Sequence, residues 1–277
     1  MTRWFKGIDF ANREQNIGVC CLEVTNRTLT VHFDTDVSEV EATGIDCPFG
    51  TSLGFWRLLQ GQDPGYDSKD DFQTRHTDRW LREHLWNYHS NTYWRENVAE
   101  NPQHYVNKTA HVQPTVRLQI VPGFLDSFRK EVGNGQLAIA IKAARRGENA
   151  YVEAHPRAFL YSAIERIWRS PASLTEPEKA LRAVAQYKDV PKVSHVDERR
   201  ATYALLQQHT PAWLGEGYQL PQALEELETL FSTDHAFDAW LSALTAFAHT
   251  ERLTITWQSA MISEDEVNVE GHILILK

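Results

Sequence analysis

Three aspartates that lie far apart in the chain have the residue type and the surroundings of metal ligands. Asp9 follows aromatic and β-branched residues in WFKGIDFA (residues 4–11), and Asp46 occupies a similar place in TGIDCPFG (residues 43–50). Asp238 lies near the start of FDAWLSALTAFA, whose apolar residues recur at helical spacing. Two strand-borne carboxylates and one helix-borne carboxylate could therefore form an acidic centre.

Such a centre is unfavourable without a cation. Two ionised carboxylates about 4 Å apart repel by roughly 4 kcal/mol at an effective dielectric constant of about 20. Mg²⁺ and Mn²⁺ relieve this repulsion because they prefer oxygen ligands, and two such ions can hold the attacking and leaving oxygens of a phosphodiester. The pattern predicts a Mg²⁺ or Mn²⁺ centre with the chemistry of phosphodiester hydrolysis.

Each aspartate also has a structural explanation. Asp9 and Asp46 could cap turns that follow strands, which aspartate often does. Asp238 could simply be an acidic residue in the first turn of a helix, where the helix dipole favours it. Asp234 lies four residues earlier on the same helical face, and it is interpreted as the N-cap of that helix rather than as a further ligand.

The elements that would position these residues follow from hydrophobic patterning and from glycine and proline. The first three expected strands would form an antiparallel meander that turns at Asn26 and Arg27, and the strand with Asp46 would return beside the first strand. Gly18 would leave room for a close approach of backbone or ligand. Strands are expected at residues 4–11, 17–24, 28–33, 43–50 and 150–155, helices at 157–169, 178–187, 197–209, 221–230 and 237–248, and terminal strands at 254–257 and 272–276.

This order of elements predicts an α/β protein with a mixed sheet in a single domain over residues 1–277. Residues 51–149 have a looser pattern, with loop composition at 61–71 and helical patterning at 74–93, and are interpreted as a mainly helical insertion. A hydrophobic content of 42% is sufficient for a core.

Charge and cysteine content narrow the function classes. The net charge of −9, from 28 basic and 37 acidic residues, excludes nucleic-acid binding by bulk electrostatics but leaves a local basic face possible. The three cysteines have neither a disulfide framework nor metal-type spacing. No apolar run is long enough for a membrane span and no signal-type segment opens the chain, so a cytoplasmic location without membrane contact is expected.

Several short motifs, taken in order, resemble a known family. The segments GIDFA with a following IGV, GIDCPFG, VEAHPRAFL, FDAWLSALTAFA and EGHILIL are similar to the successive motifs of the family named domain of unknown function 429, a group of predicted nucleases. That family looks like part of the RNase H-like superfamily. The resemblance implies a five-stranded sheet in the order 3-2-1-4-5, with Asp9 on the first strand, Asp46 on the fourth and Asp238 on the last helix as metal ligands.

The same resemblance singles out five further residues. Glu153 could assist as a fourth ligand, and His155 could carry a proton near neutral pH or only cap the helix that follows it. Arg75 could bind phosphate. Lys188 and Arg199 are placed like basic residues of the family and could bind substrate, unless they form a solvated face.

The predicted function is metal-dependent hydrolysis of nucleic acid, with water as nucleophile. The alternative is a non-catalytic RNase H-like module that binds nucleic acid or serves as a scaffold. An ATP-using relative is disfavoured because no glycine-rich phosphate loop follows the first strand. Nucleic-acid binding by a chain of this charge is expected to be modest and salt-dependent.

Overall fold

The computed structural model describes residues 1–9, 17–46, 57, 61, 76, 80, 146, 150–170, 186–188, 193–270 and 272–277. Its strands are β1 (Thr2–Asp9), β2 (Gly18–Thr25), β3 (Thr28–His32), β4 (Ala42–Asp46) and β5 (Tyr151–Ala154). Its helices are α9 (Pro156–Arg169), α11 (Val196–Gln208), α12 (Thr210–Leu214), the 3-10 helix η2 (Leu224–Leu227), α13 (Glu228–Ser232), α14 (Asp234–Thr250) and α15 (Glu264–Glu270).

The five strands form one mixed sheet in the order β3-β2-β1-β4-β5. β1 pairs antiparallel with β2, and β2 pairs antiparallel with β3, whereas β1, β4 and β5 are parallel. Asn26 and Arg27 form the turn between β2 and β3 with φ angles of 50° and 64°, as a two-residue hairpin turn requires. The predicted α/β class, strand order and meander are confirmed.

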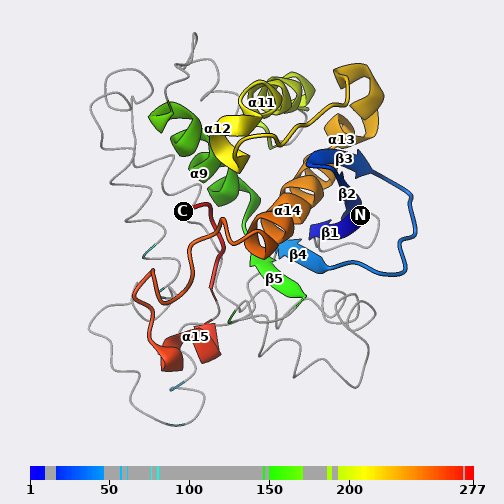
Figure 1. Ribbon diagram of the computed structural model, residues 1–277. Helices are drawn as coiled ribbons and strands as arrows, with labels where there is room; N and C mark the ends of the chain where they lie inside the picture. Colours follow the sequence, from blue (N-terminus) through cyan, green and yellow to red (C-terminus); the bar gives the residue numbers. More distant parts are fainter. Residues whose placement is uncertain are drawn as a thin grey trace.

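Helix α14 lies directly against the sheet, where it contacts β1, β2, β4 and β5 (Figure 1). Its backbone comes unusually close because the facing strand positions are glycines. A Cβ added at Gly7 would overlap the carbonyl of Ala239, and one added at Gly44 would overlap the carbonyl of Ser242. Gly18 faces the carbonyl of His235 in the same way, which confirms the close approach expected there.

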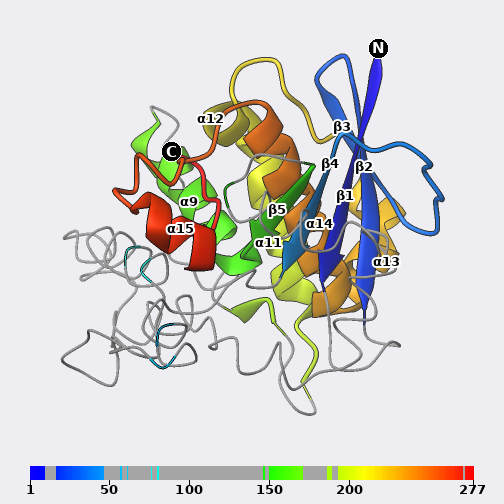
Figure 2. The same ribbon diagram turned by 90° about the horizontal axis from the view of Figure 1, so that it is seen from below.

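The core surrounds α14 on all sides. Every residue from 236 to 248 is buried, which explains why this segment is apolar almost throughout rather than on one face. On the sheet side, Phe5 meets Phe247 edge to face, with ring centroids 5.3 Å apart. Helices α9 and α13 pack against α14, and α11 and α12 extend this outer helical layer (Figures 1 and 2).

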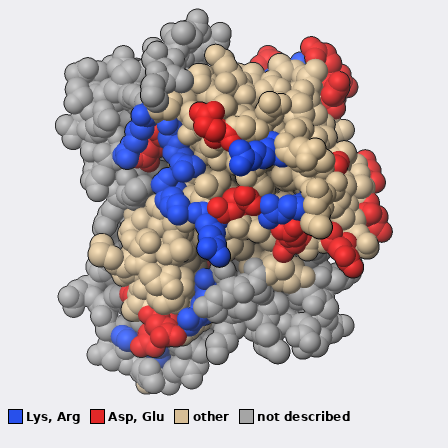
Figure 3. All heavy atoms as spheres, viewed as in Figure 1, with Lys and Arg blue, Asp and Glu red and all other residues tan. Residues whose placement is uncertain are grey.

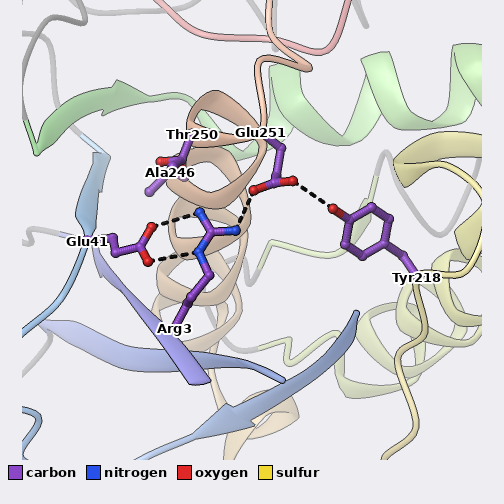
Figure 4. A network of polar contacts seen from close by, with 6 residues as sticks. All are labelled: Arg3, Glu41, Tyr218, Ala246, Thr250 and Glu251. Carbon is purple, nitrogen blue, oxygen red and sulfur yellow. Dashed lines mark hydrogen bonds and ion pairs between the residues drawn. The ribbon is translucent and has the colours of Figure 1, made fainter. Parts of the chain in front are cut away.

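A polar network joins the start of β1 to the end of α14 (Figure 4). Arg3 binds Glu41 through two hydrogen bonds of 2.8 and 2.7 Å, and its third contact reaches Glu251 at 2.5 Å. Tyr218 donates to the second oxygen of Glu251 at 2.8 Å. These four side chains, called here the Arg3 network, connect the N-terminal strand, the segment before β4, the loop after α12 and the end of α14.

Several sequence-based expectations need correction. Residues 221–230 form a 3-10 turn followed by the short helix α13 rather than one helix. The expected terminal strands are reduced to an isolated antiparallel bridge between Thr254 and Leu276. Asp234 is not the N-cap of α14, because the side chain of Thr233 accepts the N–H of Ala236 at 3.1 Å. Helices α12 and α15 were not expected.

Other expectations fall on residues that the structure does not describe. Most of the predicted insertion at residues 51–149 and most of the predicted helix at 178–187 lie there. In the described part of the chain, none of the helices combines the length and the apolar character that crossing a membrane requires.

Candidate metal centre

The carboxylates of Asp9, Asp46 and Asp238 converge at one edge of the sheet. One oxygen of each lies within 4.8 Å of one oxygen of both others. Asp9 and Asp238 are buried, and Asp46 is partly exposed. The three residues predicted as metal ligands are therefore brought together, and this set is called here the aspartate cluster.

The sheet topology explains this convergence. Asp9 and Asp46 are the last residues of two adjacent parallel strands and are register partners, so their side chains lie next to each other on the same face. Figure 2 shows that β1 and β4 end, and α14 begins, at the same edge of the sheet. Asp238, in the second turn of α14, therefore faces both strand ends.

Both oxygens of Asp238 have partners. Tyr187 donates its hydroxyl to Oδ1 at 2.7 Å, and the ammonium of Lys188 lies 2.6 Å from Oδ2. Burial raises the pKa of Tyr187 well above its usual value, so its hydroxyl stays a donor. Burial lowers the pKa of Lys188, but the charge of Asp238 and its neighbours outweighs this effect and the pKa is raised. Asp238 is thus held in a charge-assisted pair.

Asp9 has a different partner, His235 in the first turn of α14. Nδ1 of His235 lies 2.6 Å from Oδ2 of Asp9. Burial raises the pKa of Asp9, and the hydrogen bond to His235 only partly opposes this rise. The same hydrogen bond raises the pKa of His235. His235 was not among the residues predicted from the sequence, where its only signal is its position three residues before Asp238 in the segment DHAFD.

Asp46 is the least compensated member of the aspartate cluster. Burial is the main cause that raises its pKa well above the usual value, and the charges of Asp9 and Asp238 add to the rise. Lys188 acts in the opposite direction. Within the described residues no hydrogen bond offsets the rise, as His235 does for Asp9. The site therefore has an excess of negative charge.

Glu153 and His155 lie outside the aspartate cluster. Glu153 pairs in register with Ile45, whereas Asp46 pairs with Ala154, so Glu153 projects from the opposite face of the sheet. Its side chain is buried, and it is outside the aspartate cluster. His155 is the N-cap of α9 and accepts the N–H of Ala158 through Nδ1 at 3.4 Å. The capping alternative is confirmed, and a proton-carrying role stays a prediction.

The three residues predicted to bind substrate have different outcomes. Arg75 lies outside the described residues. Lys188 reaches the aspartate cluster itself. Arg199 is fully buried and donates to the carbonyls of Phe231 and Tyr187, each at 2.8 Å. Its placement on a solvated face is wrong, and contact with a substrate would require its guanidinium group to leave these carbonyls.

The donor set of the aspartate cluster fits Mg²⁺ or Mn²⁺. The ligand atoms are carboxylate oxygens, and they come from three elements packed tightly through Gly7 and Gly44. Burial raises the pKa of Asp9 and of Asp46, and the charges of the neighbouring carboxylates add to the rise. A divalent ion there would be held by Asp9, Asp46 and Asp238.

Comparison with known proteins adds no relative. No family model, no curated protein and no solved structure matches the chain. Membership of the family that the sequence motifs resemble stays a prediction.

Proposed function

We propose that this protein is a divalent-metal-dependent nuclease with an RNase H-like fold, which hydrolyses phosphodiester bonds of nucleic acid. The observation that carries the proposal is the convergence of Asp9, Asp46 and Asp238 from three separate elements to within 4.8 Å. The strand order β3-β2-β1-β4-β5, which the family resemblance implies, supports the RNase H-like assignment. Bound Mg²⁺ or Mn²⁺ would activate water and stabilise the charge that develops on the phosphate.

Residues of the chain would bind the ion and orient its ligands. Asp9, Asp46 and Asp238 would bind the ion. His235 would orient Asp9, and Tyr187 would orient Asp238, through the hydrogen bonds already present.

A phosphate group needs cations besides the metal. The ammonium of Lys188 is close enough to the aspartate cluster to meet a phosphate held there. Figure 3 shows the face on which α14 ends, away from the aspartate cluster, and Lys and Arg side chains there lie among Asp and Glu side chains. The cation that supports a phosphate-bearing partner at the aspartate cluster, despite the overall charge of −9, is therefore Lys188.

One observation favours the alternative of a non-catalytic RNase H-like module that binds nucleic acid or serves as a scaffold. Asp238 is already paired with Lys188 and Tyr187, so the aspartate cluster has a partial counter-charge without metal. In this alternative the residues form a buried polar network that stabilises the fold.

The substitution Asp9→Asn tests the enzyme directly. The amide keeps the shape of the side chain but removes a charge that binds the ion, so we expect Mg²⁺- or Mn²⁺-dependent cleavage to fall at least about 100-fold. The assay uses end-labelled single-stranded and duplex DNA and RNA with either metal, and with chelator as the blank. Circular dichroism checks that the variant is folded.

The matched control is Asp234→Asn, which removes the same charge from the first turn of α14 but lies outside the aspartate cluster. It should cleave like the wild type. Equal cleavage by wild type and Asp9→Asn would show that the activity does not depend on the aspartate cluster. Absence of cleavage by the wild type on all four substrates would favour the non-catalytic module.

A further inference from the structure

Lys188 already occupies a cation position in the aspartate cluster. Its ammonium lies 2.6 Å from Oδ2 of Asp238, an oxygen of a carboxylate that a metal would use. Its charge also acts on Asp46 and Asp9. A divalent ion and this ammonium would therefore compete for the same negative charge.

We propose that Lys188 is the resident cation of the metal-free aspartate cluster, and that a divalent ion binds only as its ammonium leaves Asp238. This inference rests on the proposed function. Before catalysis, Lys188 would lower the affinity of the metal-free aspartate cluster for a divalent ion.

The ammonium group of Lys188 can move while the neighbouring backbone stays in place. The preceding residue is anchored at both ends, because Tyr187 donates its hydroxyl to Asp238 and accepts a hydrogen bond from buried Arg199 on its carbonyl. The side chain of Lys188 is 36% exposed, in contrast to 2% for Asp238. The flexible lysine stem can therefore turn the ammonium toward solvent without unfolding the segment.

The displaced ammonium has a consequence for substrate binding. Since the preceding residue Tyr187 is anchored beside Asp238, the ammonium stays within reach of the aspartate cluster, where it can pair with a phosphate oxygen. A phosphate that holds the ammonium away from Asp238 would raise the affinity for metal, and by linkage the bound metal would raise the affinity for phosphate. The metal and the nucleic acid would then bind cooperatively.

The test measures Mn²⁺ binding by calorimetry, in the absence of nucleic acid, for wild type, Lys188→Met and Lys188→Gln. We expect both variants to bind Mn²⁺ at least about tenfold more tightly than the wild type, because the competing charge is gone. In chelator both should melt at a lower temperature than the wild type, because Asp238 has lost its ion pair. Mn²⁺ should then raise their melting temperature by more than it raises that of the wild type.

Lys6→Met is the matched control. It removes the same charge from β1, but Lys6 projects from the opposite face of that strand to Asp9. Its Mn²⁺ affinity should lie within about twofold of the wild-type value if only the ammonium beside Asp238 competes with metal.

The outcomes separate this inference from the proposed function. Binding of Mn²⁺ by the wild type without tighter binding by either variant would overturn the role of Lys188 and leave the metal centre standing. Binding by the two variants alone would support Lys188 as the resident cation but overturn metal-dependent catalysis by the native protein. No binding by any of the three proteins would overturn both.

Discussion

The three carboxylates of the aspartate cluster differ in the partners that surround them. Asp238 is held by Tyr187 and Lys188, and Asp9 by His235. Asp46 is subject mainly to burial and to the charges of its neighbours, which raise its pKa well above the usual value. Equal substitutions at these positions should therefore have unequal effects on stability.

Asp46→Asn should stabilise the metal-free protein, whereas Asp238→Asn should destabilise it. A carboxyl group whose pKa is raised on folding favours the protonated form, so its charge at pH 7 costs stability that the neutral amide restores. We expect a gain of up to about 1 kcal/mol for Asp46→Asn. We expect a loss of about 2 kcal/mol for Asp238→Asn, less than for a fully buried pair because Lys188 is partly exposed to solvent.

Thermal and urea unfolding in chelator at pH 7 measure both effects. The stability difference between Asp46→Asn and wild type should shrink as the pH falls through the raised pKa, because the wild-type carboxyl then becomes neutral. A lower melting temperature for Asp46→Asn than for wild type would instead identify Asp46 as a turn-capping residue.

At the scale of elements, the geometry of the site depends on how closely α14 approaches the sheet. The helix carries His235 and Asp238, and its backbone touches the strands at Gly7 and Gly44. Gly44 is two residues before Asp46 on the same face of β4. The spacing between the strand carboxylates and the helix carboxylate is therefore set by glycines rather than by the aspartates themselves.

Gly44→Ala should weaken both folding and metal binding. A Cβ there would overlap the carbonyl oxygen and carbon of Ser242, which belong to the backbone and cannot rotate away. We expect a loss of about 3 kcal/mol in the free energy of unfolding and a Mn²⁺ affinity at least about tenfold lower, because Asp238 is pushed away from Asp46. Urea unfolding and calorimetry measure the two quantities.

Ala42→Gly provides the comparison on the same strand and face, since it removes a methyl group instead of adding one. It should cost about 1 kcal/mol and leave Mn²⁺ binding unchanged. If Gly44→Ala were as stable as the wild type and bound Mn²⁺ equally well, close contact between α14 and β4 would not position the site.

At the scale of the whole molecule, the Arg3 network joins α14 to β1 at the end opposite the aspartate cluster. Arg3 lies near the start of β1, whereas Asp9 ends it, and Glu251 follows the last residue of α14. The network therefore holds α14 and β1 together far from the aspartate cluster (Figure 4). It should affect stability without affecting metal binding.

Glu251→Gln should remove part of the acid sensitivity of the fold. Burial raises the pKa of Glu251, but hydrogen bonds from Arg3 and Tyr218 outweigh it and hold the pKa below its usual value. A depressed carboxyl pKa contributes stability above the unfolded pKa of about 4.3, and this contribution is lost as the pH falls through the folded pKa. We expect Glu251→Gln to be about 1 kcal/mol less stable at pH 7, with no difference at the lowest pH.

Urea unfolding across the acid range measures this dependence, and Glu216→Gln in the nearby loop controls for the loss of one exposed negative charge. A constant stability difference between Glu251→Gln and wild type at every pH would contradict the assignment. Mn²⁺ affinity should equal that of the wild type in both variants.

The sequence by itself determined the framework of this protein. Strand and helix patterns are local properties, so the five strands could be recognised from hydrophobic patterning with glycine and proline, and helix α14 from the helical spacing of its apolar residues. Adjacent parallel strands bring their last residues together, so Asp9 and Asp46 could be paired once the strand order was inferred from the family resemblance. Asp238 followed from its position in FDAWLSALTAFA, the helical motif of the same resemblance.

Only the tertiary structure decided which side chains surround the aspartates. Lys188, Tyr187 and His235 carry no distinctive local pattern, and they meet the aspartate cluster because separate elements pack at one edge of the sheet. Strand register placed Glu153 on the opposite face, and packing buried Arg199 against two carbonyls. Residue type and spacing indicate which groups can do chemistry, but the direction of each side chain depends on register and packing between distant segments.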